Sequence, residues 1–352
     1  ASDMVEKKPN DSYLKKYLED GANEYQAQTA FKNIYRFPFA HYFLGTEEEL
    51  MNKPEFIRYW NFTVNTNREK FCPEKARYYA QQYYDLLSEA VKIRLRADVK
   101  IGSALSGGLD SSSIVYLINE NLKRQGKSEL QETFSSVYKS EGTEECDESK
   151  YIDLLAEKLN VNSNQIEPNE EYIPREHEKM IWHIENPPDS TLMSSWYTFL
   201  KVNMVGIKLT LDGQGADEQL GGYLMYIPSY LQSLSLSDFY KESIKFLKIP
   251  GAKKQVLLAY LLVHTRLILG ERFLREIFLI LKKRDIPLHL NLELKKSIEN
   301  DLVTLIHYAD HTSMAHGVES RMPFMDYRLI EFLATVPACY KMHNGWTKYI
   351  AR

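Results

Sequence analysis

The chain has 352 residues, with 44 lysines and arginines against 48 aspartates and glutamates, so its formal net charge is −4. This length allows one large or two modest domains. The near balance of charge excludes a polybasic surface for nucleic acid or for an anionic membrane, and it indicates a small partner.

Cysteine usage and the apolar runs restrict the compartment. Cys72, Cys146 and Cys339 lie far apart without a C-x-x-C pair, which is typical of free thiols in a reducing compartment and argues against a sulfur-bound metal. The first residues lack the apolar centre of a signal peptide, so we expect a cytoplasmic protein. The apolar run Val256–Val263 is too short to cross a membrane, and we expect it to form a buried helix.

The first elements in chain order are a small appendage, a helix and a strand. Residues 1–70 carry aromatic segments among polar linkers and show no long periodic pattern. From Glu74 to Ala97 apolar residues recur at intervals of three and four, which predicts an amphipathic helix. A strand over Val99–Leu105 follows, then Ser-Gly-Gly, and then a helix over Ser111–Leu122.

Two further strand and helix units continue the pattern. We expect a strand over Glu132–Tyr138 and a helix over Lys150–Leu159, and then a helix over Leu192–Val202 and a strand over Gly206–Leu211. Strands that alternate with helices predict an α/β fold, a parallel sheet flanked by helices. Beyond Pro228 the sequence is mostly helical, and it shows no strand signal of comparable strength.

The first chemical motif is the loop Leu105–Ser112 (LSGGLDSS) between a predicted strand and helix. Its glycines let the backbone approach an anion, and the following helix directs unpaired N–H groups and its dipole to the same place. Asp110 fits there if it holds Mg²⁺ against the phosphates. The alternative is a tight turn followed by a helix cap, which Ser-Gly-Gly alone would not exclude.

A second loop of the same kind is Leu211–Glu218 (LDGQGADE), which again follows a predicted strand. Loops at the carboxyl ends of parallel strands border one crevice, where open α/β sheets bind their ligands. Asp110 and Asp217 could therefore share a metal that bridges the phosphates of a nucleotide. Taken alone, an acidic turn of this kind is more often a calcium-free surface loop, and its partnership with the first loop favours the nucleotide site.

Four segments together resemble one protein family. SGGLDSS is similar to the PP-loop of ATP pyrophosphatases, and LDGQGADEQLGGY is similar to the second signature of asparagine synthetases. Ser313–Asp326 (SMAHGVESRMPFMD) and Gly345–Tyr349 (GWTKY) resemble later blocks of that family. The resemblance implies the adenine-nucleotide α-hydrolase-like fold of the PP-loop superfamily, with a synthetase domain over residues 71–352. It also implies that residues 1–70 are a remnant or linker from the end of a glutaminase domain.

The resemblance also implies a reaction and its cofactors. MgATP would adenylate the side-chain carboxylate of aspartate, and ammonia would convert the adenylate to asparagine and AMP. Asp110 and Asp217 would bind Mg²⁺, and Lys348 would lie beside the phosphates and stabilise their charge. The ATP-binding set would be Leu105, Ser106, Gly107, Gly108, Asp110, Ser111, Ser112, Ser136, Asp212 and Gly213, with Leu105 and Ser136 beside the adenine.

Several of these residues have plainer alternatives. Without the resemblance, the sequence favours a surface lysine at position 348. Glu319 and Arg321 are candidates for the substrate side, but a structural ion pair explains them as well. Glu185 is a further candidate on that side, although it precedes an Asn-Pro-Pro turn that would end a helix in any case.

Three departures from the family pattern leave the substrate and the nitrogen donor open. Gln214, a catalytic candidate by position, replaces a glutamate and cannot act as a general base. Met193 stands where several members have an arginine. The sequence starts Ala-Ser-Asp and has no N-terminal catalytic cysteine, so we expect ammonia to come from a missing segment, a separate subunit or solution. A fragment that lacks terminal segments, or internal ones near Arg284–Leu294, and a homodimer are both open.

The leading hypothesis is an ATP-dependent ligase that makes asparagine. The same chemistry on another carboxylate, such as closure of a lactam or amidation of a sugar acid or peptide, is the first alternative. A non-catalytic nucleotide-binding module is the second, and Gln214 favours it. The retained charges of Asp110, Asp217 and Lys348 argue against it, because clustered like charges are costly without a metal.

Overall fold

A parallel sheet of five strands lies at the centre of the structure. The structure is a computed structural model that describes residues 7–20, 26–52, 54–126, 131–140, 142–186, 192–280 and 289–352. Within these residues the strand order is β5-β4-β3-β6-β7, and every neighbouring pair is parallel. The strands are β3 (Ile101–Ala104), β4 (Glu132–Ser136), β5 (Asn162–Ile166), β6 (Leu209–Leu211) and β7 (Glu319–Arg321).

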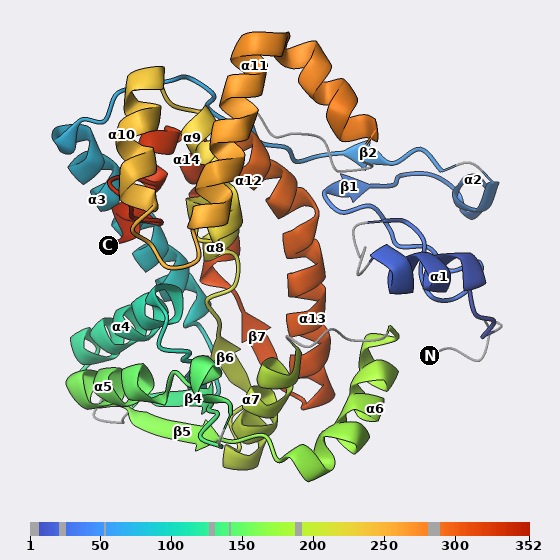
Figure 1. Cartoon of the computed structure of the whole chain (residues 1–352). Coiled ribbons are helices and arrows are strands. Elements are labelled where there is room, and N and C mark those ends of the chain that lie inside the picture. The colour runs from blue at the N-terminus through green and yellow to red at the C-terminus, as the bar shows by residue number, and fades with distance from the viewer. Residues whose placement is uncertain are drawn as a thin grey trace.

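Helices cover the sheet and continue beyond it. Figure 1 shows α3, α4 and α5 on one side of the strands and α6 and α7 near the other side, with the later helices stacked above. The helices are α1 (Asp11–Asp20), α2 (Glu47–Asn52), α3 (Pro73–Arg94), α4 (Leu109–Arg124), α5 (Ser149–Leu159), α6 (Ile173–Ile184), α7 (Leu192–Val205), α8 (Ala216–Leu220), α9 (Ile227–Gln232), α10 (Leu236–Phe246), α11 (Lys253–Ile280), α12 (Leu290–Glu299), α13 (Asp301–Ala315), α14 (Tyr327–Thr335) and α15 (Ala338–Lys341).

The strand register explains why both faces of the sheet are buried. Gly102 lies beside Thr210, and Ala104 lies beside Phe134, so Phe134 shares a face with them and Leu209 and Leu211 point to the opposite face. Phe134 packs against α7, whereas Leu209 and Leu211 join the large core cluster with α3 and α4. Helices therefore cover both faces, as expected for a parallel sheet.

The segment before α3 packs against the late helices and lies far from α4 and α5 in Figure 1. A two-stranded antiparallel ribbon joins β1 (His41–Tyr42) to β2 (Ile57–Arg58). The hydroxyl of Tyr17 hydrogen bonds that of Tyr308 on α13 at 2.9 Å, and Arg58 pairs with Glu299 on α12 at 2.9 Å. This segment is therefore attached to the α12 and α13 side. The division at residue 70 stays a prediction.

The structure confirms the fold class, an α/β sheet followed by a mostly helical region. Each strand predicted from sequence is present but shorter, because the ends run into loops. Two strands of the parallel sheet were not predicted. β5 (NSNQI) is polar, and the short β7 (ESR), which extends the sheet at its edge, lies beyond Pro228, where the sequence shows no comparable strand signal.

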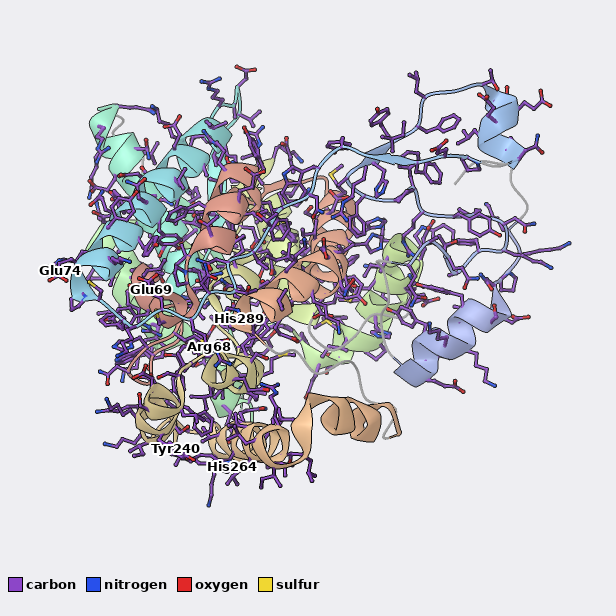
Figure 2. The ribbon with its side chains drawn as sticks, turned by 90° about the horizontal axis from the view of Figure 1, so that it is seen from above. Arg68, Glu69, Glu74, Tyr240, His264 and His289 are labelled. Atoms are coloured by element: carbon purple, nitrogen blue, oxygen red, sulfur yellow. The ribbon has the colours of Figure 1, made fainter. Side chains whose placement is uncertain are left out.

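Helix α11 corrects one expectation. Its residues Val256, Ala259, Leu262 and Val263 are buried, but Leu257 and Leu261 are 57% and 62% exposed, so only one face of the helix joins the core. Tyr240 of α10 hydrogen bonds His264 of α11 at 3.1 Å, and the two side chains lie together in Figure 2. In the part of the chain that the structure describes, none of the helices has the length and hydropathy of a membrane span.

The three cysteines are free thiols, as predicted. Cys146 is exposed, Cys72 is half-buried and Cys339 is buried. Burial raises the pKa of the Cys339 thiol to about 12, so it stays protonated. The chain start, residues 284–288 of the passage from Arg284 to Leu294, and the turn after Asn186 lie outside the described residues.

Candidate active site

The first glycine loop turns directly from β3 into α4. Gly107 adopts φ +78°, and a side chain there would meet the Cβ of Tyr151 at 2.9 Å, so the turn requires glycine. The Ser111 hydroxyl accepts a hydrogen bond from the Ser106 N–H at 3.1 Å and lies 3.0 Å from its hydroxyl. These contacts fix the loop around the start of α4, where the first N–H groups have no partners within the helix.

The second glycine loop follows β6 and touches the first. The Asp212 N–H donates to the Arg321 carbonyl at 2.9 Å, and the Gln214 N–H donates to the Asp212 carboxylate at 3.0 Å. A Cβ on Gly213 would lie 3.1 Å from the Ser111 nitrogen, so glycine lets this loop approach the first turn of α4. The two loops therefore form one site, as their position after parallel strands predicts.

Lys348 joins the two loops electrostatically. Its ammonium forms ion pairs with the Asp110 carboxylate from the first loop and with the Asp217 carboxylate from the second at 2.6 Å. The lysine is 9% exposed, which excludes the surface lysine that the sequence left open. Lys348 adopts φ +52°, a conformation uncommon outside glycine. Gly222 lies beneath the pair, and any side chain there would overlap Asp217 and Lys348.

Burial and charge shift the pKa values of this cluster. Burial raises the pKa of Asp110, and the neighbouring Asp217 raises it further, against the opposing charge of Lys348. Burial lowers the pKa of Lys348, but the two aspartates outweigh burial and the net shift is upward. The lysine therefore stays protonated near neutral pH. Desolvation also raises the pKa of Asp212.

The donor set fits a divalent cation bound together with phosphates. Oδ1 of Asp110 is buried, and no described residue forms a hydrogen bond with it. Two carboxylates from facing loops are hard oxygen ligands of the kind that Mg²⁺ prefers. Among the described residues no cluster holds three or more His, Cys, Asp or Glu ligands. Phosphate and water oxygens would therefore supply the remaining ligands of Mg²⁺.

Leu105 and Ser136, predicted to lie beside the adenine, have side chains in other contacts. Leu105 is buried in a cluster with Val115, Val137 and Ile152. The Ser136 hydroxyl donates to the Ser194 carbonyl of α7 at 2.8 Å. Both residues stand at the carboxyl ends of strands next to the first loop, so their backbones rather than their side chains face that edge of the sheet.

The side chains of the three candidate substrate residues form their recorded contacts outside the lysine cluster. Arg321 pairs with Glu319 at 2.8 Å and donates to the Arg94 and Arg96 carbonyls at 2.8 Å, so it caps the end of α3. Glu185 ends α6 with φ +63° and lines a pocket of about 1440 Å³ against the N-terminal segment. These contacts are structural, and the substrate roles stay predictions.

Two further residues belong to the site and were given no role by the sequence. Glu218, 1% exposed, accepts a hydrogen bond from the Tyr223 hydroxyl at 2.9 Å, and burial raises the pKa of this carboxyl. Glu218 directly follows Asp217, and Tyr223 is the last residue of the second signature, LDGQGADEQLGGY. Their presence in that motif was the available signal, but their pairing depends on the turn between α8 and Tyr223.

The sequence of the chain matches a known protein family. The Asparagine synthase family model matches residues 82–352. Asparagine synthetase [glutamine-hydrolyzing] 1 of Bacillus subtilis is 29% identical over 76% of this chain and 45% of its own length. Amidase chyE of Penicillium rubens is 27% identical over 92% of this chain and 55% of its own length.

A third relative, asparagine synthetase [glutamine-hydrolyzing] 3 of Bacillus subtilis, is 28% identical over 92% of this chain and 51% of its own length. The chain thus spans about half the length of the curated relatives that it matches. The family model covers most of the chain, including both glycine loops and Lys348. The chain therefore belongs to the asparagine synthase family.

Proposed function

We propose that this chain adenylates a carboxylate with MgATP and transfers the acyl group to ammonia. A carboxylate oxygen attacks the α-phosphorus, the bond to the β-phosphate oxygen breaks, and pyrophosphate leaves. Ammonia then attacks the acyl carbon, loses a proton and displaces AMP, which leaves an amide. The observation that carries this proposal is the buried Lys348, held between the acidic residues of two glycine loops at the carboxyl ends of β3 and β6.

Each part of the site has a task in this reaction. The Ser106–Ser112 loop and the start of α4 would hold the β- and γ-phosphates through N–H and hydroxyl donors. Asp110 and Asp217 would hold Mg²⁺, which neutralises phosphate charge. Asp212 and Gly213 would line the nucleotide. Lys348 would stabilise the charge that moves onto the departing pyrophosphate.

The acid substrate is proposed to be aspartate, with a different carboxylate as the alternative. The relatives include asparagine synthetases and also proteins named amidases, at similar identity. We therefore keep both aspartate and a different carboxylate as proposed substrates. Met193 is partly buried beside the α6 and α7 cluster, where the family resemblance suggests an arginine. Glu185, Glu319 and Arg321 remain the proposed substrate residues.

The nitrogen donor is proposed to be ammonia, delivered by a glutaminase domain or subunit or taken from solution. Gln214 is retained as a catalytic candidate only as a hydrogen-bond donor and acceptor, since an amide does not act as a base at neutral pH. Its main-chain N–H already binds Asp212. We therefore expect Gln214 to orient the second loop.

The test is exchange of labelled pyrophosphate into ATP, followed by release of pyrophosphate with ammonium chloride present. Aspartate and a panel of other acids are supplied one at a time. Exchange with aspartate supports the asparagine reaction, and exchange only with another acid moves the proposal to that acid. Absence of exchange with every acid would favour the nucleotide-binding module. Lys348→Met serves as the inactive comparison and Lys208→Met as the surface control, because Lys208 is exposed at the far end of β6.

A further inference from the structure

The position of the Lys348 ammonium coincides with the position that a divalent cation needs. It lies between carboxylates of two different loops, 2.6 Å from Asp217 Oδ1 and in contact with Asp110 Oδ2. The second oxygen of Asp110 is buried and has no hydrogen-bond partner among the described residues. The lysine therefore satisfies the charge of this site only in part.

We propose that Lys348 is an exchangeable cation: it fills the metal position in the metal-free protein, and Mg²⁺ displaces it towards the phosphates of the nucleotide. This inference rests on the proposed function for the identity of the phosphate ligand. It goes beyond that function because it assigns the lysine two alternative positions. The first position is stabilised by the carboxylates, and the second requires the phosphate.

A count of charges explains why the two cations compete. Asp110 and Asp217 carry −2 when ionised, so the ammonium leaves the cluster at −1 and Mg²⁺ alone would bring it to zero. Both cations together would leave a buried charge of +1, which is costly in a site of low polarity. Phosphates add several negative charges and would allow both cations to stay. Metal binding and nucleotide binding should therefore favour each other.

The proposed movement involves only the side chain of Lys348. Its stem packs directly on Gly222, where any side chain would take up the volume that the lysine stem and the Asp217 carboxylate occupy. The residue lies directly after a turn with positive φ at Asn344 and Gly345, and it begins the short turn Tyr349–Ala351. A four-carbon stem on a fixed backbone can swing its ammonium by changing rotamers, without a rearrangement of the fold.

The experiment titrates MgCl₂ into the nucleotide-free protein by isothermal calorimetry. Lys348→Met should bind Mg²⁺ at least ~10-fold more tightly than the wild type, since the competing cation is gone. Lys208→Met, which removes a charge at the opposite end of β6, should match the wild type. Adding Asp217→Asn to Lys348→Met should abolish the gain in Mg²⁺ affinity. That result would show that the extra Mg²⁺ affinity arises at this site.

Thermal unfolding gives a second, independent measurement. Without metal, Lys348→Met should melt below the wild type, because two neighbouring carboxylates lose their counter-ion. Mg²⁺ should raise its melting temperature more than that of the wild type. If Lys348→Met does not fold, Lys348→Arg decides, since a guanidinium bound to both carboxylates should weaken Mg²⁺ binding severalfold.

Equal or weaker Mg²⁺ binding by Lys348→Met would overturn the exchange, and so would unchanged binding by Lys348→Arg. The titrations contain no ATP and no acid substrate. A failed exchange therefore leaves the proposed ligase reaction untouched. Conversely, the absence of pyrophosphate exchange would count against the ligase without affecting these titrations.

Discussion

Lys341, at the end of α15, is a buried amine that the fold carries at a cost in stability. It is 1% exposed, and none of the described residues forms a hydrogen bond or ion pair with its amine. It lines a cavity of about 10 Å³ with Gln219 and Asn291. The amide oxygens of both residues are also buried without a described hydrogen-bond partner. The volume is close to what one water molecule needs, with three polar groups around it.

Burial lowers the pKa of Lys341 from 10.5 to about 7. The folded pKa is depressed, so the unfolded chain binds more protons than the folded protein between pH 7 and 10.5, and stability rises with pH across that window. A pKa of about 7 in the folded protein, against 10.5 in the unfolded chain, corresponds to a penalty approaching ~5 kcal/mol below pH 7. A water in the cavity would solvate the ammonium and make the real penalty smaller.

Lys341→Met removes this titration while keeping a side chain of similar length. We expect the variant to exceed the wild type in stability at pH 7.5, with the difference narrowing by about 2–3 kcal/mol at pH 9.5. Burial, Lys341 and Arg68 together lower the pKa of His289 to about 4, so this histidine stays neutral throughout. Arg68 and His289 lie near each other in Figure 2.

Urea unfolding of both proteins at pH 7.5, 8.5 and 9.5 measures the difference. Titration of the other groups is common to both chains and cancels in the comparison. A stability difference that is independent of pH would refute the reasoning, since it would show that Lys341 does not change its charge over this range. Lys208→Met is the matched control, because Lys208 is exposed and its removal should leave the pH dependence unchanged.

Four further substitutions test the site and its scaffold. Lys348→Met should reduce pyrophosphate release by ~10²–10³, as for other preorganised charges, with a smaller effect on ATP affinity measured by calorimetry. Asp217→Asn should abolish release while circular dichroism shows an intact fold. Gly222→Ala should also impair release, because its methyl group would overlap Asp217 and Lys348. Tyr17→Phe should cost about 0.5–1.5 kcal/mol of stability in urea unfolding, because it breaks the buried hydrogen bond to Tyr308.

The sequence predicted the elements whose pattern is local. Helix α3 has Pro73 at its start and a buried face at three-and-four spacing, and β6 is a run of three buried residues. Both were found within a few residues of their bounds. β5 was missed because its residues are polar and mostly half-buried. β7 was missed because three residues are too few to show the alternation of apolar and polar side chains that marks a strand. These two segments are strands because β5 pairs with β4 and β7 pairs with β6.

The two loops were predicted from glycines and acids after strands, but their contact was only inferred from fold logic. The packing of Gly213 on Ser111 and the position of Gly222 under Lys348 depend on tertiary distances that the sequence does not contain. Lys348 itself was ambiguous. Its burial follows from α15 and the turn beyond it, which return the chain to the carboxyl ends of the strands.

The origin of the three charges in three segments suggests why the site depends on the whole domain. Asp110 follows β3, Asp217 follows β6, and Lys348 comes after the last helix. None of the three charged side chains belongs to a hydrophobic core, and the two carboxylates repel each other. Folding therefore gains little free energy from bringing these charges together. The hydrophobic cluster that spans α3, α4, β6 and the late helices must supply that free energy.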